Sequence, residues 1–144
     1  MKINETTALL EGSGSRALME KLYGSDQVEA NIVRYKNLLK GFEMTFGDQD
    51  VLLFSSPGRT EISGNHTDHN HGKVLAGSIN LDCAGVAAKN DSRKVRVVSE
   101  TYGQDFTIDL DDLAPGIKMA GTIDLTKGLL KGFQEAGYAV ILQK

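Results

Sequence analysis

The spacing of apolar positions predicts helices in the first third of the chain. Apolar residues cluster at helical spacing over residues 1–24, and Gly12-Ser13-Gly14-Ser15 interrupts them, so we expect one helix or two short ones there. A clearer amphipathic helix follows, and Asp26 with Glu29 has the spacing of a capping box at its start. Its apolar stripe repeats with a period near 3.6 residues. The stripe consists of Val28, Ile32, Tyr35, Leu39 and Phe42.

Strand-like patterns occupy the middle of the chain. Val51 to Ser55 indicates a buried strand that ends at Pro57-Gly58, and a second strand region begins at Val74. Within the second region Cys83 is expected to be a buried thiol. Alternation of apolar and polar residues then predicts half-buried strands over 94–99 and 105–110.

The last part of the chain predicts one more helix and one more strand. Residues 124–136 carry a helical apolar stripe, and residues 138–142 have the composition of a strand. Together the patterns predict an α+β fold. In this fold the N-terminal helices pack on a mixed or antiparallel sheet of about five strands, and a C-terminal helix is added.

Length and charge narrow the class of protein. With 144 residues and 40% apolar residues, we expect a single domain over 1–144, with 1–24 as a helical lead-in and 25–144 as the core. A net charge of −3 argues against nucleic acid or an anionic membrane as the main partner. The chain has no apolar run long enough to span a membrane and no signal-peptide pattern, which predicts a cytoplasmic protein.

The most polar stretch, residues 57–72, contains three glycines, one arginine, two carboxylates, two asparagines and all three histidines. Asp68 can accept from two vicinal hydroxyls and His66 can donate or accept, as a sugar site requires. Arg59 can stabilise developing negative charge. Three alternatives remain: a structural polar loop, a hydrolase that uses Glu61 and Asp68 as acid and base, or a metal site. The metal ligands would be His66, Asp68, His69 and His71.

This stretch resembles the sugar-binding signature of galactokinases, which share a superfamily with homoserine, mevalonate and phosphomevalonate kinases. The matching residues are Pro57, Gly58, Arg59, Gly64, His66, Thr67, Asp68, Asn70, Gly72, Val74 and Leu75. The resemblance implies that Arg59 lies beside the anomeric hydroxyl of galactose as a catalytic and substrate-binding residue. It also implies that His66 and Asp68 bind ring hydroxyls. Asn65 replaces the family glutamate near the exocyclic hydroxymethyl, and His69 replaces a tyrosine.

The resemblance covers roughly residues 20–137 and implies a galactose-binding N-terminal part of a galactokinase, with a fold like ribosomal S5 domain 2. The full-length family enzyme uses ATP and Mg²⁺ to convert galactose to galactose 1-phosphate. The glycine- and serine-rich ATP loop of the family is not found in this sequence, so we expect the chain alone to be an inactive, truncated form. A galactokinase-like sugar sensor without catalysis is the alternative.

Overall fold

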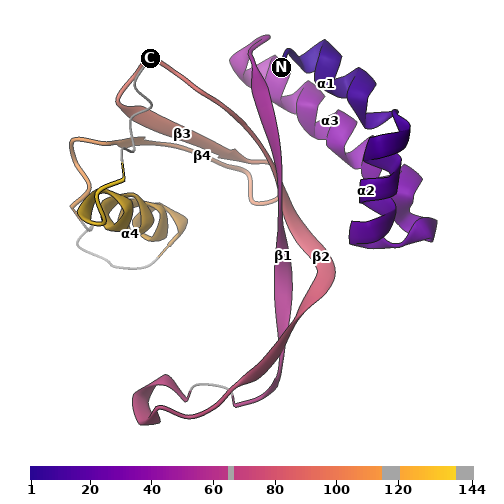
Figure 1. Ribbon diagram of the computed structural model, residues 1–144. Helices are drawn as coiled ribbons and strands as arrows, with labels where there is room; N and C mark the ends of the chain where they lie inside the picture. The colour runs from indigo at the N-terminus through magenta and orange to yellow at the C-terminus, as the bar shows by residue number, and fades with distance from the viewer. Residues whose placement is uncertain (65–66, 115–120, 139–144) are drawn as a thin grey trace. The chain divides into compact units, whose positions relative to one another are not determined.

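The computed structural model describes residues 1–64, 67–114 and 121–138. The described part combines helices with antiparallel strands, which confirms the predicted α+β class. It divides into two compact units, Met1–Lys89 and Asn90–Lys144, which are treated separately below (Figure 1). The single-domain organisation over 1–144 stays a prediction.

The first unit begins with three α-helices and a short 3-10 helix. The α-helices are α1 (Ile3–Leu10), α2 (Ser13–Tyr23) and α3 (Val28–Phe46), and the 3-10 helix η1 covers Ser25–Gln27. Of the two alternatives predicted for residues 1–24, the structure has the two short helices, and Gly12 is the N-cap of α2, where the pattern is interrupted. The predicted stripe of α3 faces the core, because Ile32, Tyr35 and Leu39 are buried and Val28 and Phe42 pack against them.

The predicted capping box at α3 is wrong. Asp26 belongs to the 3-10 helix η1, so α3 starts at Val28, one residue later than expected, with Gln27 as its N-cap and no side-chain cap. Asp26 instead accepts a hydrogen bond from the side-chain amide of Gln27. Glu29 forms an ion pair with Arg16 of α2 and so links the two helices.

A long two-stranded antiparallel ribbon follows the helices. It consists of β1 (Val51–Ser63) and β2 (Leu75–Ala88). The expectation that Pro57-Gly58 ends the first strand is wrong, since β1 continues through both residues to Ser63. Proline has no N–H to donate and is tolerated at edges and bulges of sheets. Here Pro57 pairs with Asp82 directly before a shift in the register of the two strands.

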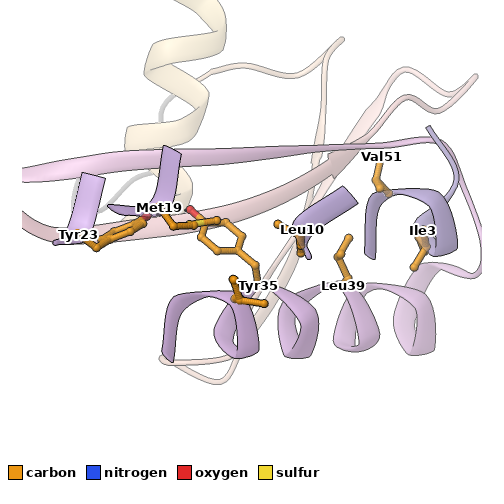
Figure 2. Close-up of a cluster of buried hydrophobic side chains, with 8 residues drawn as sticks. Ile3, Leu10, Met19, Tyr23, Tyr35, Leu39 and Val51 are labelled. Carbon is orange, nitrogen blue, oxygen red and sulfur yellow. Dashed lines mark hydrogen bonds between the residues drawn. The ribbon is translucent and has the colours of Figure 1, made fainter. Parts of the chain in front are cut away.

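The hydrophobic core of this unit lies between the helices and one face of the ribbon. Figure 2 shows core side chains of α1, α2 and α3 gathered together with Val51 of β1. The buried members are Ile3, Leu10, Met19, Tyr23, Ile32, Tyr35, Leu39 and Val51. On the ribbon, Leu53, Ala84, Val86 and Ala88 pack against them. We call this side of the ribbon the inner face.

The opposite, outer face of the ribbon carries the intervening residues. Leu52 and Phe54 are exposed there. Cys83 pairs with Ser56 in the register and is exposed as well, so the prediction of a buried thiol is wrong. The reason is strand alternation, which directs Cys83 away from the helices when its neighbours Asp82 and Ala84 face them.

The second unit contains a hairpin and one helix. Strands β3 (Lys94–Ser99) and β4 (Gln104–Asp109) pair antiparallel, and α4 covers Thr122–Glu135. Ile108, Leu110 and Leu113 are buried in this unit. Four strands in two two-stranded sheets are therefore seen among the described residues, against the expected sheet of about five. The fifth was expected at 138–142, and residues 139–142 lie outside the described part. No described helix is long and apolar enough to cross a membrane.

Candidate functional site

The stretch singled out by its polarity forms the far end of the ribbon and the connection between its strands. Arg59 to Ser63 belong to β1, a 3-10 helix η2 covers Asp68–Asn70, and β2 begins at Leu75. In Figure 1 the ribbon continues past α1, α2 and α3 before it reaches η2. The stretch is therefore part strand and part tight turn, where the sequence predicted a loop throughout.

Backbone hydrogen bonds close the turn around η2. The N–H of Gly72 donates to the carbonyl of Thr67 at 3.0 Å and to Oδ1 of Asn70 at 3.1 Å. The N–H of Asn70 donates to the same Thr67 carbonyl at 3.2 Å. His71 adopts a left-handed backbone conformation with φ 55°, which is uncommon for residues other than glycine. The segment from Thr67 to Gly72 is thus a defined turn.

Two glycines of the signature are required by this geometry. Gly64 has φ +89°, and a Cβ at this position would lie 2.3 Å from the carbonyl oxygen of Lys73. A Cβ on Gly72 would lie 2.5 Å from Cβ of Thr67. Both distances are far below van der Waals contact, so any larger residue would force the ends of the turn apart.

Arg59 projects from β1 with its side chain 75% exposed. Its Nη2 donates to Oε1 of Glu61 at 3.0 Å, and the Glu61 side chain is only 29% exposed. Residues two apart on a strand lie on the same face, which allows this contact. Glu61 therefore acts as a partner that orients the guanidinium of Arg59.

The remaining predicted site residues are described only in part. Asn65 and His66 lie outside the described residues. Asp68 is the first residue of η2, and its side chain is not described. His69 and His71 are exposed. Within residues 1–64, 67–114 and 121–138, no three His, Cys, Asp or Glu side chains come together as a metal site.

Sequence reasoning missed a polar cluster on the inner face of the ribbon, centred on the buried side chain of Asp82. The Asp82 side chain is 3% exposed. Its Oδ1 accepts from Nη1 of Arg34 at 2.5 Å, and its Oδ2 accepts from the hydroxyls of Tyr23 and Ser55, each at 2.6 Å. Nη2 of Arg34 also donates to the Asp82 carbonyl at 3.1 Å. We call Asp82, Arg34, Tyr23 and Ser55 the Asp82 cluster.

The protons of this cluster can be assigned from its geometry. A hydroxyl carries one proton, and an ionised carboxylate can only accept, so Tyr23 and Ser55 each donate to Asp82. The Tyr35 hydroxyl then has two acceptors in reach, the Tyr23 hydroxyl at 3.0 Å and the Phe54 carbonyl at 3.5 Å, and the shorter distance favours donation to Tyr23. The cluster is fully satisfied, as a buried charge requires.

The cluster also shifts the pKa of three of its groups, and for the Arg34 guanidinium the hydrogen bond to Asp82 raises the pKa. Burial alone would raise the pKa of the Asp82 carboxyl, but the hydrogen bonds from Ser55, Tyr23 and Arg34 outweigh it, so this pKa falls below its usual value. Burial first, and then the hydrogen bond to Asp82, raise the pKa of the Tyr23 phenol well above its usual range. At neutral pH the carboxylate is ionised and the phenol is protonated.

One sequence signal could have revealed this cluster. Asp82 shares its strand face with Ala84, Val86 and Ala88, which are the residues that pack on the helices. The alternation of Ile79, Leu81 and Cys83 favours the opposite side of the strand as the buried one. A carboxylate in phase with small apolar residues indicates a buried charge that needs partners on a neighbouring element.

Comparison with known proteins gives consistent matches. The family model for the galactokinase galactose-binding signature matches residues 40–89. Streptococcus mutans galactokinase is 34% identical over 110 residues, covering 75% of this chain and 28% of that protein. Exiguobacterium sibiricum galactokinase is 35% identical over 101 residues, covering 69% of this chain and 26% of that protein.

A solved structure extends the match to three dimensions. The crystal structure of Lactococcus lactis galactokinase complexed with galactose matches with a TM-score of 0.64 and 33% identity. The match covers 74% of this chain and 28% of that one. The chain thus spans little more than a quarter of the length of these relatives. It is related to the galactokinase family through a region that includes the galactose-binding signature.

Proposed function

We propose that this chain binds galactose through residues 57–72 and is the galactose-binding part of a galactokinase. The observation that carries the proposal is the arrangement of the signature: one ribbon supports Arg59 on β1 and ends in the closed turn that contains Asp68. The likeness to a galactokinase solved with galactose, over 74% of this chain, supports the same conclusion.

Each proposed site residue has a distinct role. Asp68 accepts hydrogen bonds from two adjacent ring hydroxyls, and His66 donates to or accepts from another. Asn65 binds the hydroxymethyl side of the sugar without the charge that a glutamate would bring. Arg59 lies beside the anomeric oxygen, where its positive charge offsets the negative charge that develops when this oxygen attacks a phosphoryl group.

The whole reaction needs more than these residues. Phosphoryl transfer depends on holding the phosphates and a metal ion in line with the attacking oxygen. A Mg²⁺ ion of this kind is held by one or two carboxylates together with the phosphates of the nucleotide, so its site also needs the polypeptide that binds those phosphates. We therefore assign ATP and Mg²⁺ binding to polypeptide that corresponds to the unmatched part of the relatives. For this chain the function is sugar recognition.

Calorimetric titration of the chain with D-galactose tests the proposal. We expect saturable binding that Asp68→Ala abolishes, since two hydrogen bonds to a charged acceptor are lost, each worth roughly 1.5–3 kcal/mol. Asp91→Ala is the matched control, because Asp91 is an exposed carboxylate of the second unit. Equal galactose affinity in wild type and Asp68→Ala would refute the assignment, and so would the absence of binding to the wild-type chain.

A further inference from the structure

Asp82 lies in a particular pair of opposed residues of the ribbon, and we call such a pair a rung. It pairs with Pro57, and the next pair in the register is Arg59 with Ser78. Strand β1 therefore advances by two residues while β2 advances by four, which makes a bulge directly between Asp82 and the position opposite Arg59. The Pro57–Asp82 rung is the last regular one before the ribbon reaches Arg59.

The packing of the ribbon changes at the same rung. On the core side, Val51, Leu53, Ala84 and Val86 pack among the helices. On the signature side, Arg59 to Ser63 are all exposed. In Figure 1 this part of the ribbon lies beyond α1, α2 and α3. The direction in which the ribbon leaves the core is thus set at or next to the Asp82 rung.

The Asp82 cluster joins this rung to two helices. Tyr23 is the last residue of α2, Arg34 lies on α3, and Ser55 lies on β1 two positions before Pro57. All three donate to one carboxylate, and charge-assisted hydrogen bonds are shorter and stronger than neutral ones. A bulge increases the local bend and twist of a strand. Because the cluster holds the strands on the core side of the bulge, it also fixes the direction of the part of the ribbon beyond the bulge.

We propose that Asp82 is a positioning residue for the galactose site. It holds the Pro57–Asp82 rung against α2 and α3, so that Arg59 and the turn around η2 are presented in one fixed orientation. Asp82 does not touch the sugar; it acts through the strand that carries Arg59. This inference rests on the proposed function for its effect on galactose, but the geometric claim can be tested separately.

The test uses the full chain with Asp82→Asn, which keeps the shape of the side chain and removes its charge. Two spin labels report the geometry: one at Val33→Cys on α3 and one at Ile62→Cys on β1, both at exposed positions. Both the reference chain and the Asp82→Asn variant carry Cys83→Ser, because Cys83 is an exposed free thiol. We expect a narrow distance distribution in the reference chain and a clearly broader one in Asp82→Asn, together with a roughly tenfold weaker galactose affinity.

A matched control separates positioning from general stability. Ile32→Val removes a methylene from the core of α3 without touching the cluster, so it lowers the melting temperature and leaves the distance distribution and the galactose affinity unchanged. If Asp82→Asn does not fold, Ser55→Ala and Ser55→Thr replace it. Ser55→Ala should broaden the distribution and weaken galactose binding, and Ser55→Thr, which keeps the hydroxyl, should restore both.

The outcomes distinguish the two proposals. A wild-type chain that binds no galactose refutes the proposed function, while the distance distributions still decide the geometric claim. Distributions of equal width in Asp82→Asn and the reference chain, or in the two Ser55 variants, overturn the positioning role. Equal broadening in Ile32→Val would also overturn it, because loss of core packing alone would then explain the effect.

Discussion

Arg59 donates from Nη2 to Oε1 of Glu61 across 3.0 Å, and the two residues lie two positions apart on the same strand. The carboxylate is the less exposed partner, with 29% of its side chain accessible against 75% for Arg59. Exposed ion pairs contribute little to stability, typically about 0–1 kcal/mol. The importance of this pair is therefore the orientation of the guanidinium and not the strength of the fold.

Neutralising Glu61 should affect binding more than folding. We expect Glu61→Gln to change the free energy of unfolding by less than about 1 kcal/mol. The galactose dissociation constant should rise severalfold, because the guanidinium loses its charged partner. Urea unfolding and calorimetry measure the two effects, with Glu100→Gln as a control at an exposed position of the second unit. A large loss of stability with unchanged affinity would contradict this role.

Gly64 should tolerate no side chain. Alanine at φ +89° costs roughly 1–2 kcal/mol in the backbone, and its Cβ would also meet the Lys73 carbonyl at 2.3 Å. We expect Gly64→Ala to abolish galactose binding but to lower the melting temperature only slightly, since the turn lies outside the core. Gly77→Ala is the control, because nothing lies within 4 Å of a Cβ at Gly77. If both variants bind galactose as wild type does, the turn is not needed for the site.

The Asp82 cluster should make stability fall at both ends of the pH scale. The folded-state pKa of Asp82 is lowered, so its contribution is present above the unfolded value of about 3.9 and is lost as pH falls through the folded value. The folded-state pKa of Tyr23 is raised, so its contribution is present below about 10 and is lost as pH rises towards the folded value.

Variants separate the loss of stability at acid pH (the acid limb) from the loss at alkaline pH (the alkaline limb). Urea unfolding of Asp82→Asn should show a loss of about 2 kcal/mol at pH 7 relative to wild type, and the difference should shrink below about pH 4. Tyr23→Phe should flatten the alkaline limb while leaving an acid limb. A difference between wild type and Asp82→Asn that stays constant from about pH 7 to about pH 3 would show that the carboxylate is not held ionised by its partners.

Removal of metal should not affect the fold. The alternative site would use His66, Asp68, His69 and His71, all in the connection between the strands. The core of the first unit is made of apolar side chains of α1, α2, α3 and the ribbon. We expect the melting temperature to be the same with and without a strong chelator. A drop of many degrees on chelation would instead support a structural metal ion.

Local patterns predicted the elements but not the faces of the ribbon. The apolar stripe from Val28 to Phe42 identifies one face of the helix as the buried one. Burial of Ile32, Tyr35 and Leu39 confirms this prediction. Strand alternation leaves open which of the two faces is buried, and the sequence favoured burial of the face that carries Leu81 and Cys83. The structure buries the face of Asp82, because α2 and α3 supply Tyr23 and Arg34 from 59 and 48 positions away. Partners so distant leave no periodic signal.

For the candidate site, too, the sequence predicted one part and not the other. The spacing from Arg59 to Gly72 identified the signature, and the family comparison agrees. Continuation of β1 through Pro57 could not be predicted, since it depends on the bulge opposite Gly58 in β2. The pairing of Arg59 with Glu61 follows only from this continuation, because residues two apart meet on one face only when the backbone is extended.

Catalysis should require polypeptide beyond this chain. The chain covers 28% of Streptococcus mutans galactokinase, and orienting two reactants can contribute roughly 7–11 kcal/mol to a rate enhancement. We expect no galactose-dependent ADP release from the 144-residue chain with ATP and Mg²⁺. Supplying the unmatched part of the Streptococcus mutans enzyme in trans should produce release that Arg59→Ala abolishes. Galactose-dependent turnover by the chain alone, lost in Arg59→Ala, would mean that these residues also hold the phosphates.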